Sequence, residues 1–181
     1  MAFSETGIEG LLLFEPKIWG DDRGFFYESY NKDTFLQAGI SCEFVQDNQS
    51  FSSYGVLRGL HYQCGEHSQS KMVSVLEGEV LDVVVDLREE SKTYGKTYSV
   101  RLSRENKRQL FIPRRFAHGF VVLSETALFF YKCDNLYNKA SEGGILFNDP
   151  ILNIDWEIDL KDAILSEKDM ELPHFGQHRI P

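Results

Sequence analysis

Apolar and polar residues alternate in short runs along most of the 181-residue chain, and turn or charged residues separate the runs. Such runs are typical of β-strands, because successive side chains of a strand point to opposite faces of the sheet. The clearest runs are residues 11–14, 44–63, 72–87, 97–102, 109–112, 117–123 and 127–133. They predict a mainly β fold, an antiparallel sandwich or barrel of jelly-roll type. No repeat or linker divides the chain, so we expect one domain, residues 1–181.

The run at residues 72–87 predicts a β-hairpin with its turn at Glu77-Gly78. In its second arm, the odd-numbered residues 81–87 are all apolar and share one face. The opposite face includes Asp82 and Asp86.

Helix is expected in only two places. Asn31 is a suitable N-cap for a short helix over residues 32–38, which Gly39 would end. The tail after Trp156 turns polar, and we expect it to be helical, with Ser166 as an N-cap.

The stretch at residues 44–63 is unusually polar for a predicted strand region. It sets Gln46, Asp47, Asn48, Arg58 and His61 among apolar residues, in FVQDNQSFSSYGVLRGLHYQ. A buried polar group without a hydrogen bond costs roughly 2–7 kcal/mol by transfer data. The stretch is therefore expected to line a wet pocket, with His61 as its titratable centre.

The net charge of −9 argues against a nucleic-acid-binding or anionic membrane-binding surface. A small phosphorylated ligand remains compatible with this charge, because it needs only a few cations close by. The candidate cations are Arg23, Arg58, Lys71, Arg114, Arg115 and Lys168.

The three cysteines form no CxxC pair, so we predict neither a disulfide framework nor a zinc knuckle, and a reducing cytoplasm fits best. The N-terminus has no basic region and no apolar run reaches 18 residues. We therefore expect neither a signal peptide nor a membrane span.

Three residues on apolar strands suggest acid–base chemistry. His61, Lys71 and Tyr131 could supply a base, an electrophile and an acid. Each also has a structural interpretation, since a strand histidine is usually structural and an interior tyrosine needs only a bonded hydroxyl. His118 likewise fits a hydrogen-bonded core histidine, and Asp169 fits a capping box with Ser166.

A metal site is not predicted. Jelly-roll barrels that bind a metal usually gather about three histidines and a carboxylate, often through an H-x-H pair. Here Gln63 stands two residues after His61, and His67 falls in a polar loop. Only His61 and His118 are well placed on strands.

Seven strings, in order along nearly the whole chain, resemble the dTDP-4-dehydrorhamnose 3,5-epimerases of the cupin superfamily. They are DDRGFFYES (21–29), FVQDNQS (44–50), GVLRGLHYQ (55–63), GEVLDVVVDLR (78–88), AHGFVVLSE (117–125), YKC (131–133) and LSEKD (165–169). The resemblance implies a cupin-type jelly roll without metal or organic cofactor. It also implies a homodimer in which the N-terminal arm, residues 11–28, crosses to the other subunit. The implied reaction converts dTDP-4-keto-6-deoxy-D-glucose to dTDP-4-keto-L-rhamnose.

The resemblance also assigns roles to individual residues. It makes His61 the base, Tyr131 the acid, Lys71 the cation beside the keto oxygen and Asp169 the partner that orients the histidine. The residues matching nucleotide-sugar contacts are Arg23, Glu28, Gln46, Asp47, Asn48, Arg58, His118, Glu142 and Lys168.

Two features depart from the family pattern. Arg115 stands where the family usually has glycine, which implies a changed or strained turn. Between Trp156 and Asp169 there is one apparent extra residue, and Glu157 replaces the usual proline.

Arg58 and His61 pose a geometric problem, because residues three apart on a regular strand point to opposite faces. The resemblance nevertheless puts both in one pocket. Either a bulge at Gly59 adds a residue, or the Arg58 side chain wraps around the strand edge. We favour the bulge, since glycine within a strand often marks one.

The sequence alone leaves other functions open. Related enzymes invert only carbon 3 or carbon 5, or move the ketone between carbons 3 and 4. A metal-dependent cupin oxygenase is disfavoured by Gln63, and a non-catalytic sugar-nucleotide binding module is disfavoured because His61 and Tyr131 are both present.

Overall fold

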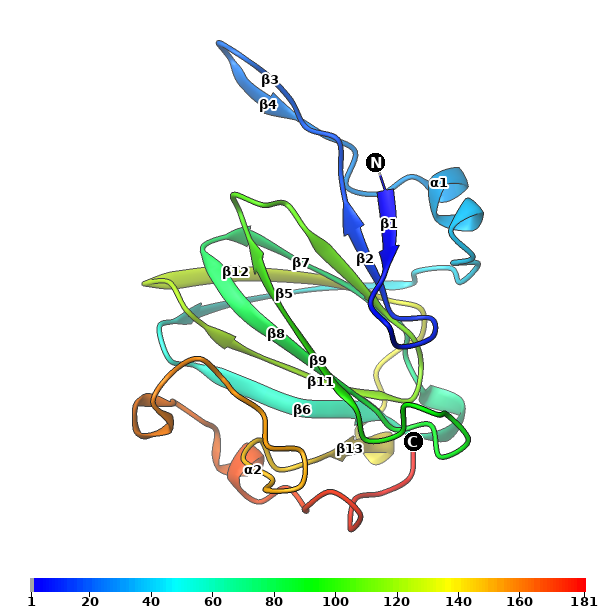
Figure 1. Ribbon diagram of the computed structural model, residues 1–181, viewed down its shortest axis with the longest axis vertical. Helices are drawn as coiled ribbons and strands as arrows, with labels where there is room; N and C mark the ends of the chain where they lie inside the picture. The colour runs from blue at the N-terminus through cyan, green and yellow to red at the C-terminus, as the bar shows by residue number, and fades with distance from the viewer. Residues whose placement is uncertain (1) are drawn as a thin grey trace.

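Two antiparallel β-sheets packed face to face form the body of the protein, and a small third sheet projects from it (Figure 1). The computed structural model describes residues 2–181. The six-stranded sheet has the order β1 (Ala2–Glu5), β2 (Leu12–Glu15), β10 (Gln109–Ile112), β7 (Lys71–Glu77), β12 (Thr126–Cys133) and β5 (Gln46–Ser53). The five-stranded sheet has the order β13 (Glu142–Gly144), β6 (Leu57–Gln63), β11 (Phe116–Val122), β8 (Glu79–Asp86) and β9 (Thr97–Ser103). The expected mainly β, antiparallel fold is confirmed.

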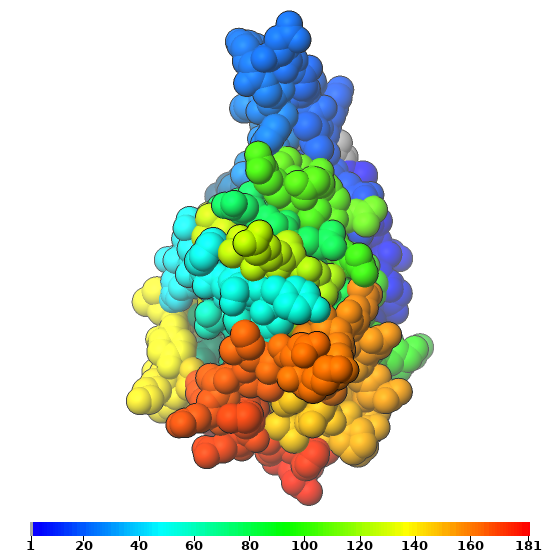
Figure 2. Space-filling view, turned by 90° about the vertical axis from the view of Figure 1, so that its left-hand side faces the viewer, coloured from blue at the N-terminus to red at the C-terminus, as the bar shows by residue number. Residues whose placement is uncertain are grey.

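The projecting sheet is a hairpin of β3 (Trp19–Asp21) and β4 (Gly24–Phe26). It stands clear of the body, as the blue arm at the top of Figure 2 shows. Its large apolar side chains are exposed, with Phe26 at 67% and Phe25 at 53%. Apolar groups in such a position leave much of their surface in contact with solvent within this chain.

Three apolar clusters hold the layers together. The first lies between the two sheets and includes Val73, Val84 and Phe129. In the second, the C-terminal segment packs side chains such as Trp156 on the outer face of the five-stranded sheet. The third joins Phe35 of α1 (Lys32–Gln37) to the outer face of the six-stranded sheet. The outer face of β5 lacks such a cover, and its Phe51 is 63% exposed.

The helix at residues 32–38 is confirmed, with the Asn31 side chain accepting hydrogen bonds from the backbone N–H groups of Asp33 and Thr34. The expectation of a helical tail was mostly wrong. Beyond Trp156 the helical pieces are only η3 (Leu160–Asp162) and α2 (Glu167–Met170). The remaining short helices of the chain are η1 (Gly65–His67) and η2 (Lys139–Ser141).

The tail is extended where its backbone binds the body of the protein. The Ile164 N–H donates to the Gly55 carbonyl, and the Leu57 N–H donates to the Ile164 carbonyl. Leu165 packs into the second cluster. Tertiary contacts therefore override the local preference for helix. No helix among residues 2–181 is long and apolar enough to span a membrane.

The predicted hairpin at residues 72–87 was wrong in its pairing. Both arms are strands, but β7 lies in the six-stranded sheet and β8 in the five-stranded sheet. Gly78, at φ +77°, turns the chain from one sheet to the other, and a Cβ there would collide with the Thr126 carbonyl oxygen. Each arm carries apolar residues on both faces, which suits a central strand with two neighbours better than one arm of an isolated hairpin.

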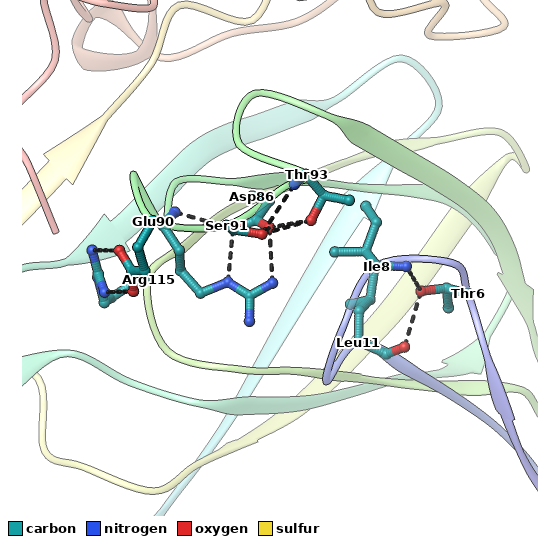
Figure 3. A network of polar contacts seen from close by, with 9 residues as sticks. Thr6, Ile8, Leu11, Asp86, Glu90, Ser91, Thr93 and Arg115 are labelled. Atoms are coloured by element: carbon teal, nitrogen blue, oxygen red, sulfur yellow. Dashed lines mark hydrogen bonds and ion pairs between the residues drawn. The ribbon is translucent and has the colours of Figure 1, made fainter.

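A network of hydrogen bonds holds the loop after β8 in place (Figure 3). The buried Asp86 carboxylate accepts hydrogen bonds from Arg88, from Ser91 at 2.8 Å and from Thr93 at 2.6 Å. Burial alone would raise the pKa of Asp86, but these donors lower it to about 2. Arg115 lies beside this network and binds both carboxylate oxygens of Glu90.

Arg115 adopts φ +68°, the left-handed region that the usual glycine would occupy at little cost. The turn is therefore of the strained kind that the sequence suggested.

Candidate active site

Two adjoining cavities, of about 560 Å³ and 310 Å³, open between the sheets. β5, β7 and β12 supply one wall, while β6 and β11 supply the other, and α2 lies at the rim. The residues lining both cavities are Asn48, His61, Lys71, Tyr131 and Lys168. All four residues to which the sequence assigned a catalytic role, His61, Lys71, Tyr131 and Asp169, line the larger cavity.

His61 and Asp169 form a hydrogen-bonded pair. His61 Nε2 donates to Asp169 Oδ1 at 2.5 Å, and the Asp169 carboxylate is nearly fully buried. Burial by itself would raise the pKa of Asp169, but the hydrogen bond and charge of His61 hold it below its ordinary value. The carboxylate fixes the imidazole tautomer, which leaves Nδ1 as the nitrogen that can accept a proton.

Ser166 positions Asp169. Its hydroxyl accepts a hydrogen bond from the Asp169 backbone N–H at 3.2 Å, as an N-cap does. The carboxylate is then directed at His61. The capping interpretation and the functional interpretation of Asp169 therefore describe the same short helix.

The predicted bulge in β6 is present. His61 pairs with His118 and Arg58 pairs with Phe120, so three steps along β6 match two along β11. Gly59, at φ +123°, is the extra residue, and the Gly59–Leu60 peptide bond is cis. Arg58 and His61 consequently line the same cavity.

Tyr131 and Lys71 face His61 from the other sheet. Tyr131 lies on β12, and Lys71 on β7 places its Nζ 5.8 Å from the centre of the Tyr131 ring. Burial raises the pKa of Tyr131 and lowers the pKa of Lys71. The cavity thus holds a histidine on one wall and a phenol with an ammonium group on the opposite wall.

His118 lies deep in the larger cavity, and its Nε2 donates to Asp82 Oδ2 at 2.8 Å. Burial lowers the pKa of His118, which favours the neutral imidazole. It is a hydrogen-bonded core histidine that also lines the cavity, so both interpretations given to it apply.

Polar contacts connect the remaining residues around the cavities. Gln46 Nε2 donates to Asn48 Oδ1 at 3.0 Å, and Arg58 donates to Ser52 Oγ. At the rim, Lys168 Nζ donates to Glu142 Oε2 at 2.6 Å.

Burial alone would raise the pKa of Glu142, but the hydrogen bonds from Lys168 and Tyr137 lower it. The rim therefore carries a charged pair that can exchange partners with an ionic ligand.

Three predicted ligand contacts lie away from these cavities. Arg23, at the tip of the arm, pairs with Asp21 and its side chain is 90% exposed. Glu28 accepts a hydrogen bond from the Asn31 side chain. Asp47 faces the outer side of β5 and pairs with Lys132, because it alternates with Gln46 and Asn48. These positions do not support a role for Arg23, Glu28 or Asp47 in the cavities of their own chain.

Two lining or supporting residues were missed in the sequence. Tyr137 lines the smaller cavity with a half-exposed ring, and its backbone N–H donates to Gln46 Oε1. It lies in a polar loop with no periodic pattern to reveal it. Asp82 accepts a hydrogen bond from the His118 ring. Asp82 could have been identified from the sequence, because it is a carboxylate in an otherwise apolar strand.

Within residues 2–181, no three His, Cys, Asp or Glu side chains gather as a metal site would require. His61 and His118 face each other across neighbouring strands, but each is bound to its own carboxylate.

Comparison with known proteins gives consistent matches. The sequence profile of a family described as dTDP-4-dehydrorhamnose 3,5-epimerase matches residues 5–177. A dTDP-4-dehydrorhamnose 3,5-epimerase of Shigella flexneri is 53% identical over 167 residues, covering 92% of this chain and 91% of the relative.

Two crystal structures resemble this one over nearly their whole length. That of dTDP-4-dehydrorhamnose 3,5-epimerase from Elizabethkingia anophelis has a TM-score of 0.94 at 58% identity and covers 97% of both chains. That of a Legionella pneumophila dTDP-6-deoxy-D-glucose-3,5-epimerase is a complex with dTDP-4-keto-L-rhamnose. Its TM-score is 0.93 at 50% identity, and the match covers 97% of this chain and 93% of that one.

Proposed function

Because the chain belongs to the dTDP-4-dehydrorhamnose 3,5-epimerase family, we propose that it converts dTDP-4-dehydro-6-deoxy-D-glucose to dTDP-4-dehydro-L-rhamnose, in dTDP-L-rhamnose biosynthesis. The family resemblance and the cupin-type jelly roll expected from the sequence are confirmed. The observation that best supports the reaction is the placement of the His61–Asp169 pair and Tyr131 on opposite walls of one cavity.

Epimerisation beside a ketone needs three groups. A hydrogen on carbon 3 or carbon 5 is acidic because the resulting carbanion spreads its charge onto the oxygen of the 4-ketone. His61 takes this proton at Nδ1, and the Lys71 ammonium stabilises the enolate oxygen. Tyr131 returns a proton to the same carbon from the opposite face, which inverts its configuration. His61 then releases its proton to solvent and Tyr131 regains one from solvent, after which the same steps invert the second carbon.

The rest of the ligand is a nucleoside diphosphate, and the site residues match its parts. The Arg58 guanidinium lies in the larger cavity and suits a diphosphate, since its planar fork binds two phosphate oxygens together. Tyr137 offers a ring face for stacking on the thymine, while Gln46 and Asn48 offer amide groups to its edge. Lys168 would exchange Glu142 for a phosphate oxygen.

The active assembly is a homodimer in the cytosol. The arm of β3 and β4 exposes Trp19, Phe25 and Phe26, and β5 leaves the apolar Phe51 exposed. Crossing of the arm to a second subunit would bury these residues and bring Arg23 and Glu28 to the partner's cavity. The three free cysteines, Cys42, Cys64 and Cys133, suit a reducing compartment.

Incubation with dTDP-4-dehydro-6-deoxy-D-glucose in heavy water tests the reaction. We expect NMR to show deuterium at carbons 3 and 5 and a product inverted at both. Deuterium and inversion at one carbon would instead indicate a mono-epimerase. Movement of the ketone to carbon 3 would indicate a 3,4-ketoisomerase, and no exchange at all would rule out the proposed reaction.

A further inference from the structure

Asp82 is a carboxylate inside the main core of the protein. It lies on the inner face of β8 between Val80 and Val84, and none of its surface is exposed. Removing a charge from water carries a penalty of several kcal/mol, so an apolar residue at this position would serve stability equally well or better. The presence of Asp82 therefore calls for a reason other than stability.

The two oxygens of Asp82 differ in their surroundings. Oδ2 accepts the hydrogen bond from His118 Nε2, whereas Oδ1 accepts none from any residue among 2–181. His118 in turn lines the reaction cavity. The carboxylate thus lies one side chain away from the cavity, on the buried side of His118.

Lys71 lies on the same face of β7 as Val73 and Val75, which pack in one core cluster with Val80 and Val84 of β8. It therefore faces the sheet that carries Asp82. Burial lowers the pKa of Lys71, and the influences that raise it again are Cys133 and Asp82. The pKa of the Cys133 thiol is itself raised by burial to about 11, so this thiol is neutral near pH 7. Asp82 is then the negative charge that favours the Lys71 ammonium.

Other titratable groups surround this pair on the elements packed about it. They are His61 on β6, His118 on β11, Tyr131 and Cys133 on β12, and Asp169 and Lys168 on α2. Asp169 is already committed to His61, and Lys168 to Glu142. Asp134, which accepts a hydrogen bond from the Ser70 N–H next to Lys71, is paired with Arg114, and Glu142 is paired with Lys168. Asp82 is therefore the carboxylate in this group without a cationic partner of its own.

We propose that Asp82 is a positioning residue for the epimerisation, orienting His118 through a hydrogen bond and stabilising the Lys71 ammonium through its charge. This inference rests on the proposed function only for the role of that ammonium beside the enolate oxygen. Neutral Lys71 would lose most of its ability to stabilise an oxyanion, so Asp82 extends the pH range in which the site works. The Nε2–H bond to Asp82 holds the His118 ring in one tautomer and one orientation.

The test compares Asp82→Asn with Asp86→Asn. The two aspartates lie four residues apart on the same face of β8, and both are buried, but Asp86 binds Arg88 and the loop instead of the cavity residues. The first measurement is NMR titration of the lysine ¹³Cε resonances, with Lys71 assigned by its loss in Lys71→Met. We expect Lys71 to titrate at lower pH in Asp82→Asn and at its wild-type position in Asp86→Asn.

The second measurement is the pH profile of kcat. Loss of the carboxylate should move the alkaline limb of the profile to lower pH and lower kcat about 10- to 100-fold, with KM changed much less. Asp86→Asn should lower thermal stability and leave the profile in place. Asp82→Leu, which keeps an apolar core, serves as a second variant and should move Lys71 in the same direction.

Unchanged Lys71 titration in both Asp82 variants, or a kcat loss matched by Asp86→Asn, would overturn the inference. The NMR titration requires no turnover. A wild-type protein without epimerase activity would therefore refute the proposed function, while the titration would still decide the electrostatic role of Asp82.

Discussion

At the scale of single residues, the two histidines of the cavity show how the environment of a side chain determines its role. They pair directly across β6 and β11, and each donates Nε2–H to a carboxylate. The His61 side chain is 37% exposed and sits where substrate can reach it, whereas His118 is 8% exposed. Only His61 combines access with a free Nδ1 at the surface of the cavity, which suits a base.

His61→Ala and Tyr131→Phe should both lose most turnover, by roughly 10²–10⁴-fold each, as general acid–base groups do. Their exchange patterns should differ. Without the base no proton leaves, so His61→Ala should show no deuterium exchange in heavy water. Tyr131→Phe should retain some exchange at carbon 3 without net inversion. Full epimerisation by Tyr131→Phe would mean that another group is the acid.

Asp86 provides a stability prediction with a defined pH dependence. Its pKa is lowered to about 2, below the ordinary aspartate value, so the folded state favours the ionised form. This contribution, roughly 2 kcal/mol, is fully present above about pH 4 and is lost as the pH falls towards 2. Asp86→Asn should therefore lower the free energy of unfolding by about that amount at pH 7, measured with urea. A deficit that stays constant down to pH 2 would contradict the charge-based explanation.

At the scale of elements, the sequence predicted the strands well and one pairing badly. Short β-rich runs between turn or charged residues locate β9, β10, β11 and β12, although β10 and β11 are buried on both faces and show no alternation. Such runs say nothing about partners, and the proximity of β7 and β8 in sequence suggested a hairpin that does not form. The Gly59 bulge could be predicted because Arg58 and His61 had to share a pocket, a constraint that alternation alone could not meet.

The positions of site residues were predictable to the extent that they lie on strands. Gln46 and Asn48 reach the cavity while Asp47 between them points outward, as the period of two requires. Tyr137 escaped prediction because it lies in a loop whose course is set by its hydrogen bond to Gln46. Ion pairs such as Lys168 with Glu142 depend on tertiary structure and leave no local pattern.

Gly59→Ala tests the bulge. A Cβ at this position would lie 2.5 Å from Gly119 Cα and 2.8 Å from the His118 carbonyl oxygen, at a φ that other residues rarely adopt. We expect a loss of about 3 kcal/mol or more in the free energy of unfolding, together with most activity.

Gly176→Ala is the matched control, since Gly176 has φ +84° but open space around it. It should lose only about 1–2 kcal/mol and keep full activity. Equal losses in the two variants would mean that the close approach of β6 to β11 contributes nothing to stability or activity.

At the scale of the whole molecule, the arm of β3 and β4 projects from the body, and the proposed homodimer gives it a second subunit to bind. Its aromatic residues stack on one another, and Lys107 lies 3.9 Å from the centre of the Phe25 ring. Such contacts within the arm favour its extended shape in the single chain, which would reduce the entropy lost on association.

Light scattering at micromolar concentration should give twice the mass of one chain. Phe26→Ser should weaken the dimer, because this residue is 67% exposed in the single chain. Ile151→Ser is the control, since Ile151 is equally exposed but lies in the C-terminal segment far along the chain. A monomeric wild-type protein would refute the proposed exchange of the arm.

Subunit mixing distinguishes a crossed arm from an arm that serves its own cavity. In a heterodimer of Arg23→Ala and His61→Ala chains, a crossed arm leaves one site with both native residues. Random mixing should then restore about a quarter of the native sites. Activity should be measured below KM, where loss of a binding arginine is visible. No restoration would indicate that Arg23 acts within its own chain.

The crossing of the chain between sheets at Gly78 also has a consequence for how the protein is made. β5, β6 and β7 carry His61, Lys71 and Arg58 of the cavity, and every strand partner they have begins after residue 108. During synthesis at about 5–20 residues per second, β5 waits roughly 4–16 s for β12 to be made. Throughout that interval, apolar strands with unpaired edges are exposed on the ribosome. Expression yield should therefore depend more on chaperone supply and temperature than the stability of the finished barrel would suggest.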